Sequence, residues 1–473
     1  MLQFAWAINT FIAGSFAAPT ANFSGPAINS WSRTPQTVSW TLTAVSNAQN
    51  GGLANGIAGF SKAWDSLPPD SANKSTPGSG DSFYSGPTSP NATSGSLALN
   101  NGTEGCHTAH VRTWDNGGTT ADRTYGPVCY DDIAPSASCA APDGLWHATD
   151  VSLHCTASDT LSGLANPSDS SFNLTTSVPA NTETSNAFTN SHTVLDVAGN
   201  STTKGPYGGN MVDKKPPTVS CGSPDGGWHA TDVAIPCTAS DGGSGLANPA
   251  DASFNLTTSV PAGTETATAA TNSHAVPDAV GNTTTAGPIS PNKVDKKPPA
   301  ITITQPAATT YTHSATLTLN YSVTDGGSGV ASFTPTMNGQ PTAGGVSLAN
   351  GSAITLLTHL SLGPNTFAIG AVDNVGNHSS SSVTFTIIVT AQSMIDDVNQ
   401  LVASGAISST QATSLLAKLN NALSKQTSGQ CTPAGNMYNA FINEVNAQTG
   451  KSITPAAAAI LIADAQYLIT HCP

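Results

Sequence analysis

The sequence predicts a mainly β chain, made of tandem antiparallel β-sandwich modules and ended by a small four-helix domain. Three observations lead to this fold class. A long segment recurs almost verbatim at an offset of 82 residues. Within each copy, apolar and polar residues alternate with the period of two that half-buried strands have. Near Thr390 that period gives way to the spacing of amphipathic helices.

The repeat divides the chain into modules before any local motif is considered. Modules 2 (135–214) and 3 (215–297) hold the near-identical copies. Module 1 (26–134) and module 4 (298–390) are more divergent, but they keep the landmarks in the same order. Each of the first three modules ends in a proline-bearing segment, which we call its exit: YDDIAP at Tyr130, and VDKKPP at Val212 and at Val294. Prolines restrict the backbone at these segments, which predicts a semi-rigid array of modules.

Short strands are expected within each module. The segments Thr316 to Val323 and Val383 to Val389 show the alternation most clearly. Several such strands in 80 to 100 residues, separated by turn residues, are typical of a small sandwich.

The remaining residues, 391–473, predict four short helices. Apolar stripes recur at helical spacing, and three helix starts are marked. Ser408 with Gln411 suggests a capping box, and Thr432 and Thr454 each precede a proline at the first helical position.

The composition excludes several classes of function. The chain has 473 residues, of which only 9% are charged, and its net charge is -14. Its three arginines, Arg33, Arg112 and Arg123, are scattered, whereas binding to nucleic acid requires clustered basic residues. We therefore expect no nucleic-acid partner, and an exported β protein fits this composition.

The first residues suggest export. Residues 1–25 are predicted to be a signal peptide or leader, with Ser15 and Ala17 before the cleavage site. No Lys or Arg precedes the apolar run, so a fragment or misassigned start is the alternative. Because no later segment offers 18 consecutive apolar residues, we expect no transmembrane helix in the mature chain.

The eight cysteines fall into local couples, which indicates a disulfide framework and an oxidising compartment. No CxxC is present, so a zinc ribbon or redox motif has no support. The alternative is eight reduced cysteines in the core. The predicted couples are Cys106 with Cys129, Cys139 with Cys155, Cys221 with Cys237, and Cys431 with Cys472.

Two resemblances follow from these motifs. The SD-x-x-SG and D-x-x-GN landmarks with VDKKPP exits, over residues 26 to 390, resemble bacterial immunoglobulin-like repeats of secreted and cell-surface proteins. The segment from Ala440, AFINEVNAQTGKSITPAAAAILIADAQYLI, resembles the FIMAH domain of exported bacterial proteins. These resemblances imply spacer or adhesive modules and a helical end domain, and neither supplies a catalytic residue.

Repeated aspartates are weak candidates for calcium, the only cofactor considered. Oxygen ligands gathered near a module junction could hold Ca²⁺ and stiffen the array. The favoured interpretation is turn chemistry, because Asp and Asn accept backbone hydrogen bonds and Gly allows positive φ. Asp131, Asp132, Asp213 and Asp295 at the exits favour calcium slightly. The candidates are Asp159, Asp196, Asp241, Asp278, Asp325 and Asp373.

Tryptophan and histidine residues are the other candidates for a binding role. Trp146 and Trp228 are weak candidates for stacking on sugar rings, but we expect them in the core, packed on the disulfides. His107 and His110 are three residues apart on an expected strand, so they should point to opposite faces and not form a metal pair.

The sequence shows none of the common catalytic motifs, and we expect no enzyme. The leading hypothesis is a secreted or cell-surface scaffold or adhesion protein whose modules act as a spacer. Its expected partners are extracellular proteins or polysaccharide, reached through loops at the module ends. The alternative is the non-catalytic C-terminal region of a larger secreted hydrolase.

Overall fold

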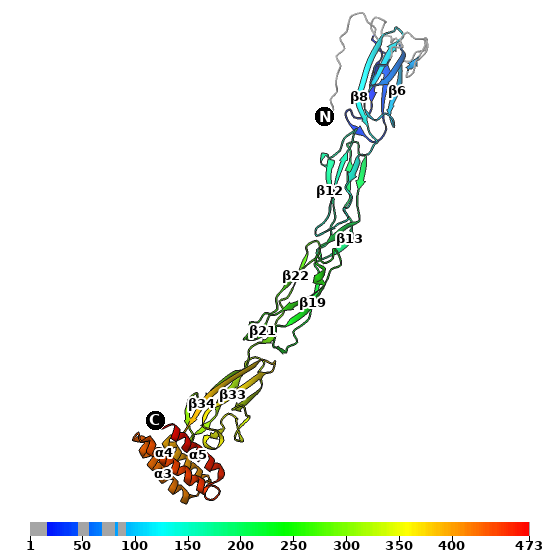
Figure 1. The fold of residues 1–473 in the computed structure, drawn as a ribbon. Helices are drawn as coiled ribbons and strands as arrows, with labels where there is room; N and C mark the ends of the chain where they lie inside the picture. Colours follow the sequence, from blue (N-terminus) through cyan, green and yellow to red (C-terminus); the bar gives the residue numbers. More distant parts are fainter. Residues whose placement is uncertain (1–16, 46–55, 69–80, 84–90, 473) are drawn as a thin grey trace. The chain divides into compact units, whose positions relative to one another are not determined.

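The computed structural model describes residues 17–45, 56–68, 81–83 and 91–472 (Figure 1). The predicted leader lies outside this part up to residue 16. The chain divides into two compact units, each described by itself below. One holds residues 1–217, 241–247 and 277–283, and the other holds 218–240, 248–276 and 284–473. The two loops of module 3 that carry aspartate motifs thus belong to the first unit.

Module 1 is a sandwich of two sheets, with strand orders β1-β3-β6 and β2-β8-β7-β4-β5. Trp40 and Phe60 meet edge to face in its core, at a centroid distance of 5.8 Å. The expected start at residue 26 is too late, because β1 pairs with β3 before that point. The strands are β1 (Thr20–Ser24), β2 (Trp31–Ser32), β3 (Gln36–Thr43), β4 (Ile57–Trp64), β5 (Asp81–Phe83), β6 (Ala92–Leu99), β7 (Gly105–Asp115) and β8 (Thr120–Tyr130).

Module 2 folds into three small sheets, ordered β12-β11-β9, β10-β16-β13 and β14-β15. A single-turn 3₁₀ helix, η2 (Pro167–Ser170), is capped by the Asn166 side chain. The strands are β9 (Ser136–Cys139), β10 (Trp146–His147), β11 (Ser152–Ser158), β12 (Ser171–Thr175), β13 (Glu183–Ala187), β14 (His192–Leu195), β15 (Ser201–Lys204) and β16 (Asn210–Asp213).

Module 3 repeats the sheets of module 2, as its sequence requires. Its orders are β17-β19-β20, β18-β24-β21 and β22-β23, and η3 (Pro249–Ala252) stands where η2 stood. The strands are β17 (Thr218–Cys221), β18 (Trp228–His229), β19 (Ala234–Ser240), β20 (Ser253–Thr257), β21 (Glu265–Ala269), β22 (His274–Pro277), β23 (Thr283–Ala286) and β24 (Asn292–Asp295).

All four predicted disulfides are present: Cys106–Cys129, Cys139–Cys155, Cys221–Cys237 and Cys431–Cys472. The first three join residues directly opposite each other on neighbouring strands of one sheet. They therefore staple sheets internally, whereas the disulfide of an antibody domain connects its two sheets.

Module 4 is the largest sheet system of the second unit, built on the order β26-β34-β33-β29. The single strand expected from Thr316 to Val323 is two strands, because the chain changes sheet at Leu319, whose N–H donates to Ser352 O. The elements are β25 (Ala300–Gln305), β26 (Thr310–Thr312), β27 (Thr316–Thr318), β28 (Asn320–Thr324), β29 (Val330–Met337), β30 (Thr342–Ala343), β31 (Val346–Ser347), β32 (Ala353–Thr355), α1 (Leu356–His359), β33 (Gly363–Asp373) and β34 (His378–Ile388).

Four helices follow, as predicted: α2 (Ala391–Ala403), α3 (Ser409–Thr427), α4 (Cys431–Gln448) and α5 (Pro455–Thr470) (Figure 1). Ser408 and Thr454 cap α3 and α5 as expected. The predicted capping box at Ser408 is wrong, because the Gln411 side chain donates to Glu444 instead. The predicted cap at Thr432 is also wrong: α4 begins at Cys431, and Pro433 is accommodated in the first turn, where its missing N–H costs nothing.

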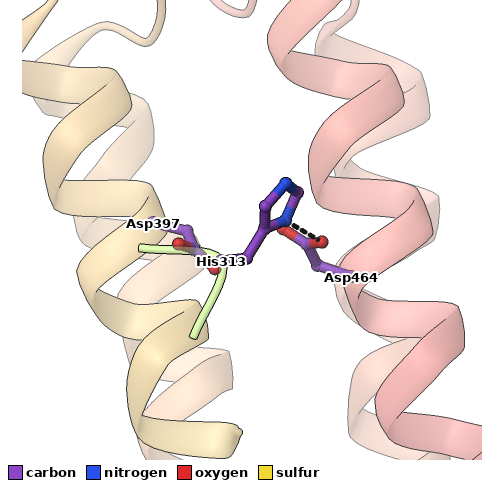
Figure 2. A group of neighbouring side chains, drawn as sticks. All are labelled: His313, Asp397 and Asp464. Carbon is purple, nitrogen blue, oxygen red and sulfur yellow. Dashed lines mark hydrogen bonds and ion pairs between the residues drawn. The ribbon is translucent and has the colours of Figure 1, made fainter. Parts of the chain in front are cut away.

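The helical domain and module 4 share one apolar core. Leu357 and Val389 of module 4 are 2% and 4% exposed and pack among the buried residues of the helices. Beside this core, His313 follows β26 and reaches between α2 and α5 (Figure 2). Among the described residues, no helix is long and apolar enough to cross a membrane.

Candidate functional site

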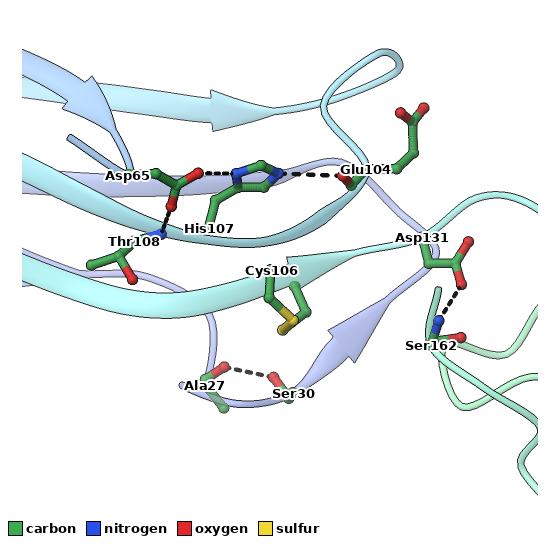
Figure 3. The surroundings of a disulfide bond; sticks show 10 residues. Ala27, Ser30, Asp65, Glu104, Cys106, His107, Thr108, Asp131 and Ser162 are labelled. Atoms are coloured by element: carbon green, nitrogen blue, oxygen red, sulfur yellow. Dashed lines mark hydrogen bonds and ion pairs between the residues drawn. A yellow bond between two sulfur atoms is a disulfide. The ribbon is translucent and has the colours of Figure 1, made fainter. Parts of the chain in front are cut away.

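The exit aspartate of each of the first three modules is buried against loops of the module that follows. Asp131, after β8, is 0% exposed. Its carboxylate accepts from the N–H of Ser162 at 3.0 Å (Figure 3). It also accepts from the N–H of Ile133 at 2.9 Å. Its carbonyl accepts from the side-chain amide of Asn200 at 2.8 Å. One residue of module 1 is therefore held at three points, two of them in module 2.

The same arrangement recurs at the next two exits. Asp213 accepts from Ser244 N–H at 2.7 Å and Asp295 accepts from Ser328 N–H at 2.7 Å. Their carbonyls accept from Asn282 and Asn377 of the following modules, at 2.8 and 2.9 Å. We call this repeated set the junction lock: exit aspartate, the serine N–H of the SD-x-x-SG loop, and the asparagine of the D-x-x-GN turn.

The D-x-x-GN motifs are turns, as the favoured interpretation expected. The Oδ1 atoms of Asp196, Asp278 and Asp373 each accept from the N–H four residues later, at 2.8 Å. Their other oxygens accept from the amide of the same asparagine, at 2.6 to 2.8 Å. The turn thus orients that amide towards the carbonyl of the preceding module, a function that the sequence did not reveal.

The SD-x-x-SG aspartates leave oxygens unused. Asp241 and Asp325 each accept from a glycine N–H at 2.8 Å through Oδ2. Their Oδ1 atoms are buried without a hydrogen-bond partner. Asp159 differs, because its Oδ1 accepts from Gly163 at 2.7 Å and from Leu161 at 3.1 Å.

Three carboxylate clusters result, in each of which the oxygens lie within 4.8 Å of one another: Asp131, Asp159 and Asp196; Glu183, Asp213 and Asp241; Glu265, Asp295 and Asp325. Asp278 and Asp373 lie close enough to the second and third clusters to raise the pKa of Asp241 and Asp325. Sequence reasoning missed Glu183 and Glu265, although their recurrence at the 82-residue offset was the available signal.

The second and third clusters are electrostatically strained. Burial raises the pKa of Asp241, and the negative charges of Asp213, Asp278 and Glu183 raise it further, against one hydrogen bond that lowers it. Glu183 is paired with Lys215 at 3.3 Å, and Glu265 with Lys297 at 3.1 Å. Acidic groups thus outnumber the lysine in each cluster, and buried oxygens of Glu183 and Glu265 also lack a partner.

Glycines allow the loop to close on the exit aspartate. A Cβ atom on Gly243 would lie 2.5 Å from the Asp213 carboxylate, and one on Gly327 would lie 2.6 Å from that of Asp295. Real Cβ atoms do not approach so closely, so the glycines of DGGSG permit this close approach at the second and third junctions, whereas Thr160 and Leu161 stand at the equivalent positions of the first.

The other candidates do not join these clusters. Trp146 and Trp228 are half-buried and belong to none of the buried core clusters, so the expected core position is wrong. Because the disulfides lie within a sheet, no tryptophan is needed between two sheets to cover them. Their possible role in sugar stacking stays a prediction.

His107 forms no metal pair with His110. Its Nδ1 lies 2.5 Å from Asp65 Oδ2, and its Nε2 lies 3.3 Å from the carbonyl of Glu104 (Figure 3). Burial raises the pKa of Asp65, but the N–H of Thr108 and the His107 ring outweigh it, so the pKa is lowered overall. Because Asp65 follows β4, this group ties the end of that strand to β7.

Residues 391–470 match the model of the FIMAH domain family, so the chain ends in a FIMAH domain. The modules before it form a tandem β repeat. No curated protein sequence matches the chain.

Solved structures of extracellular repeats are similar to the chain at low identity. A Ca²⁺-stabilised adhesin of an ice-binding Antarctic bacterium has 16% identity and a TM-score of 0.27, covering 79% of this chain and 100% of that one. Tandem repeats from the extending region of a large adhesion protein have 14% identity and a TM-score of 0.30, with the same coverage. Fibronectin(III)-like modules of Clostridium thermocellum CbhA have 10% identity and a TM-score of 0.16, covering 53% and 94%. Since these TM-scores are below 0.5, the assignment of the sandwich fold rests on the strand orders above.

Replacing Gly243 by alanine should weaken the junction lock. The new Cβ would collide with the Asp213 carboxylate, and overpacking of this kind costs about 1–3 kcal/mol. Urea unfolding of the full chain should show this loss for Gly243→Ala. The matched control is Gly222→Ala in the same module, where the nearest atom is 3.5 Å away. Equal stability of the two variants would contradict the lock.

Proposed function

We propose that the chain is a non-enzymatic, exported scaffold that acts at the cell surface or outside the cell. In this proposal the immunoglobulin-like modules are a semi-rigid spacer, and adhesive contacts to extracellular proteins or polysaccharide are made by loops at the module ends. The four disulfides support an oxidising compartment.

The observation that carries this proposal is the junction lock. It occurs at three successive exits, with the same donor and acceptor atoms each time. A hydrogen bond to a charged group contributes roughly 1.5–3 kcal/mol, and these carboxylates are buried away from competing water. If each module only carried its own binding site, the orientation of one module relative to the next would not need to be fixed in this way. A spacer does, because its reach depends on how little each junction bends.

Removing the three lock asparagines together should make the array more flexible. The variant Asn200→Ala/Asn282→Ala/Asn377→Ala loses the three side-chain hydrogen bonds to the carbonyls of the exit aspartates. Small-angle X-ray scattering of the full chain should show a broader distance distribution than for the wild type. Asn255→Ala, at an exposed position on β20, is the control. An unchanged distribution, with circular dichroism unaltered, would refute the spacer.

Calcium is a second element of the proposal, at the clusters of Glu183 and Glu265. Ca²⁺ takes six to eight oxygen ligands. The second cluster offers two buried carboxylate oxygens without a partner among the described residues, from Glu183 and Asp241, and the third offers their counterparts from Glu265 and Asp325. A bound cation would offset the excess of negative charge and tighten the lock.

Calcium should therefore raise the melting temperature of the chain, and EDTA should lower it. Asp241→Asn and Asp325→Asn should each reduce the calcium-dependent shift, because each removes one carboxylate from a cluster. Asp225→Asn is the matched control, since that aspartate of module 3 is exposed and pairs only with His229 and backbone. If EDTA has no effect on any of these proteins, the calcium sites are wrong and the hydrogen-bond lock acts alone.

The alternative, that the chain is the accessory region of a larger secreted hydrolase, shares the same spacer role. The mass of the native polypeptide distinguishes the two. An antibody against the FIMAH domain should detect, in culture supernatant or cell wall, a species near 47.5 kDa or slightly smaller if the scaffold stands alone. A much larger species would favour the hydrolase alternative.

A further inference from the structure

Three ionisable side chains are buried together where the FIMAH domain meets module 4. His313 follows β26, Asp397 lies on α2 and Asp464 lies on α5 (Figure 2). Their exposed fractions are 4%, 0% and 0%. One residue of the β module thus reaches between two helices that are far apart in sequence, and both helices present a carboxylate to it.

The hydrogen bonds of this group are incomplete. His313 Nδ1 lies 2.8 Å from Asp464 Oδ1. In the described part of the chain, no other residue donates to the oxygens of Asp397 or to Oδ2 of Asp464, and the two carboxyl groups can satisfy one another only by sharing a proton. One ligand atom from each residue can be chosen so that all three lie within 4.8 Å of one another. Buried carboxylate oxygens without a partner are costly, so their presence requires an explanation.

The charges of the two aspartates are also unfavourable in this buried position. Burial raises the pKa of Asp397 to about 8, and the neighbouring charges of Asp464 and Asp396 add to the effect. Burial also raises the pKa of Asp464, although the hydrogen bond from His313 opposes it. Without a cation, one proton shared between Asp397 and Asp464 relieves the repulsion between their charges, and a bound cation would displace that proton.

The histidine is oriented as a metal ligand would be. Its Nε2 lies 3.3 Å from the carbonyl of Leu360. An N–H at Nε2 would donate to that carbonyl and leave the lone pair of Nδ1 directed at the two carboxylates. Metal-bound histidines usually have their second nitrogen fixed in this way.

A route from solvent exists. A surface depression of about 510 Å³ is lined by residues 357–362 on one side and by Ala459, Ile460 and Ala463 of α5 on the other, and it reaches His313. Neither aspartate lines this depression, so His313 is the member of the group that lies nearest to solvent.

We propose that His313, Asp397 and Asp464 bind one divalent transition-metal ion of the zinc class, which joins module 4 to the FIMAH domain. One imidazole and two carboxylates form a three-residue donor set with a position left for water. Imidazole favours such an ion over Ca²⁺, which prefers oxygen ligands only. The ion would neutralise both carboxylates and fix α2, α5 and the end of β26 to one another.

The test is a titration of the full chain with Zn²⁺ in the presence of excess Ca²⁺, so that the oxygen-only clusters at the junctions do not take part. We expect one Zn²⁺ per chain, a higher melting temperature when it is bound, and the intense visible spectrum of four-coordinate Co²⁺ when that ion replaces it. Asp397→Asn and Asp464→Asn should each weaken binding at least ~10-fold.

Asp396→Asn is the matched control: that neighbouring carboxylate is exposed on α2 and acts on Asp397 through its charge, so the stoichiometry should stay at one and the affinity should change much less than in the two ligand variants. The exposed pair of His229 and Asp225 supplies a second control, His229→Asn, against adventitious binding. Absence of stoichiometric binding to the wild type would overturn the proposal, whether or not the variants fold. Binding that survives both Asp397→Asn and Asp464→Asn would overturn it as well.

Discussion

The junctions between the modules depend on one buried carboxylate that belongs to one module and is solvated by the next. Asp131, Asp213 and Asp295 leave water completely, so each needs donors to replace its hydration. Part of that supply comes from the backbone of the following module, and this is what makes the contact specific. An apolar contact of similar area would tolerate sliding, whereas a carboxylate aligned with a particular N–H does not.

Ion pairs next to the junction lock also involve several of the few charged residues of the chain. Lys214 pairs with Asp150 and Lys296 pairs with Asp232, in each case within the module that precedes the junction. From the sequence, the exit segment looks like a simple linker. These ion pairs instead bind it to its own module. The prolines restrict the backbone of the exit segment, and the lysine–aspartate ion pairs just before them hold the same few residues in place.

The last junction follows a different principle. Module 4 does not end in an exit aspartate, and its final strand leads into Val389, which is buried among the helices. Apolar packing holds this junction, and the polar group of His313, Asp397 and Asp464 gives it a defined geometry. The helical domain presents stripes of apolar side chains, which can be buried against module 4. The end of a small β module presents mainly backbone and loops, so a junction between two such modules relies on hydrogen bonds. The two kinds of junction therefore reflect the groups that each partner can bury.

The sequence by itself determined the repeat, the period of the strands, the four helices and the four disulfide pairs, because each depends on local spacing or on a recurrence that is visible along the chain; it placed the start of module 1 too late. It also identified the aspartates, for which it favoured turns and kept calcium as the alternative. Only the tertiary structure decided that Asn200, Asn282 and Asn377 contact another module, and that Glu183 and Glu265 join the clusters. It likewise brought His313 to Asp464, 151 residues away. Such contacts depend on how separate elements pack, and a side chain's partner across a junction leaves no periodic trace in its own segment.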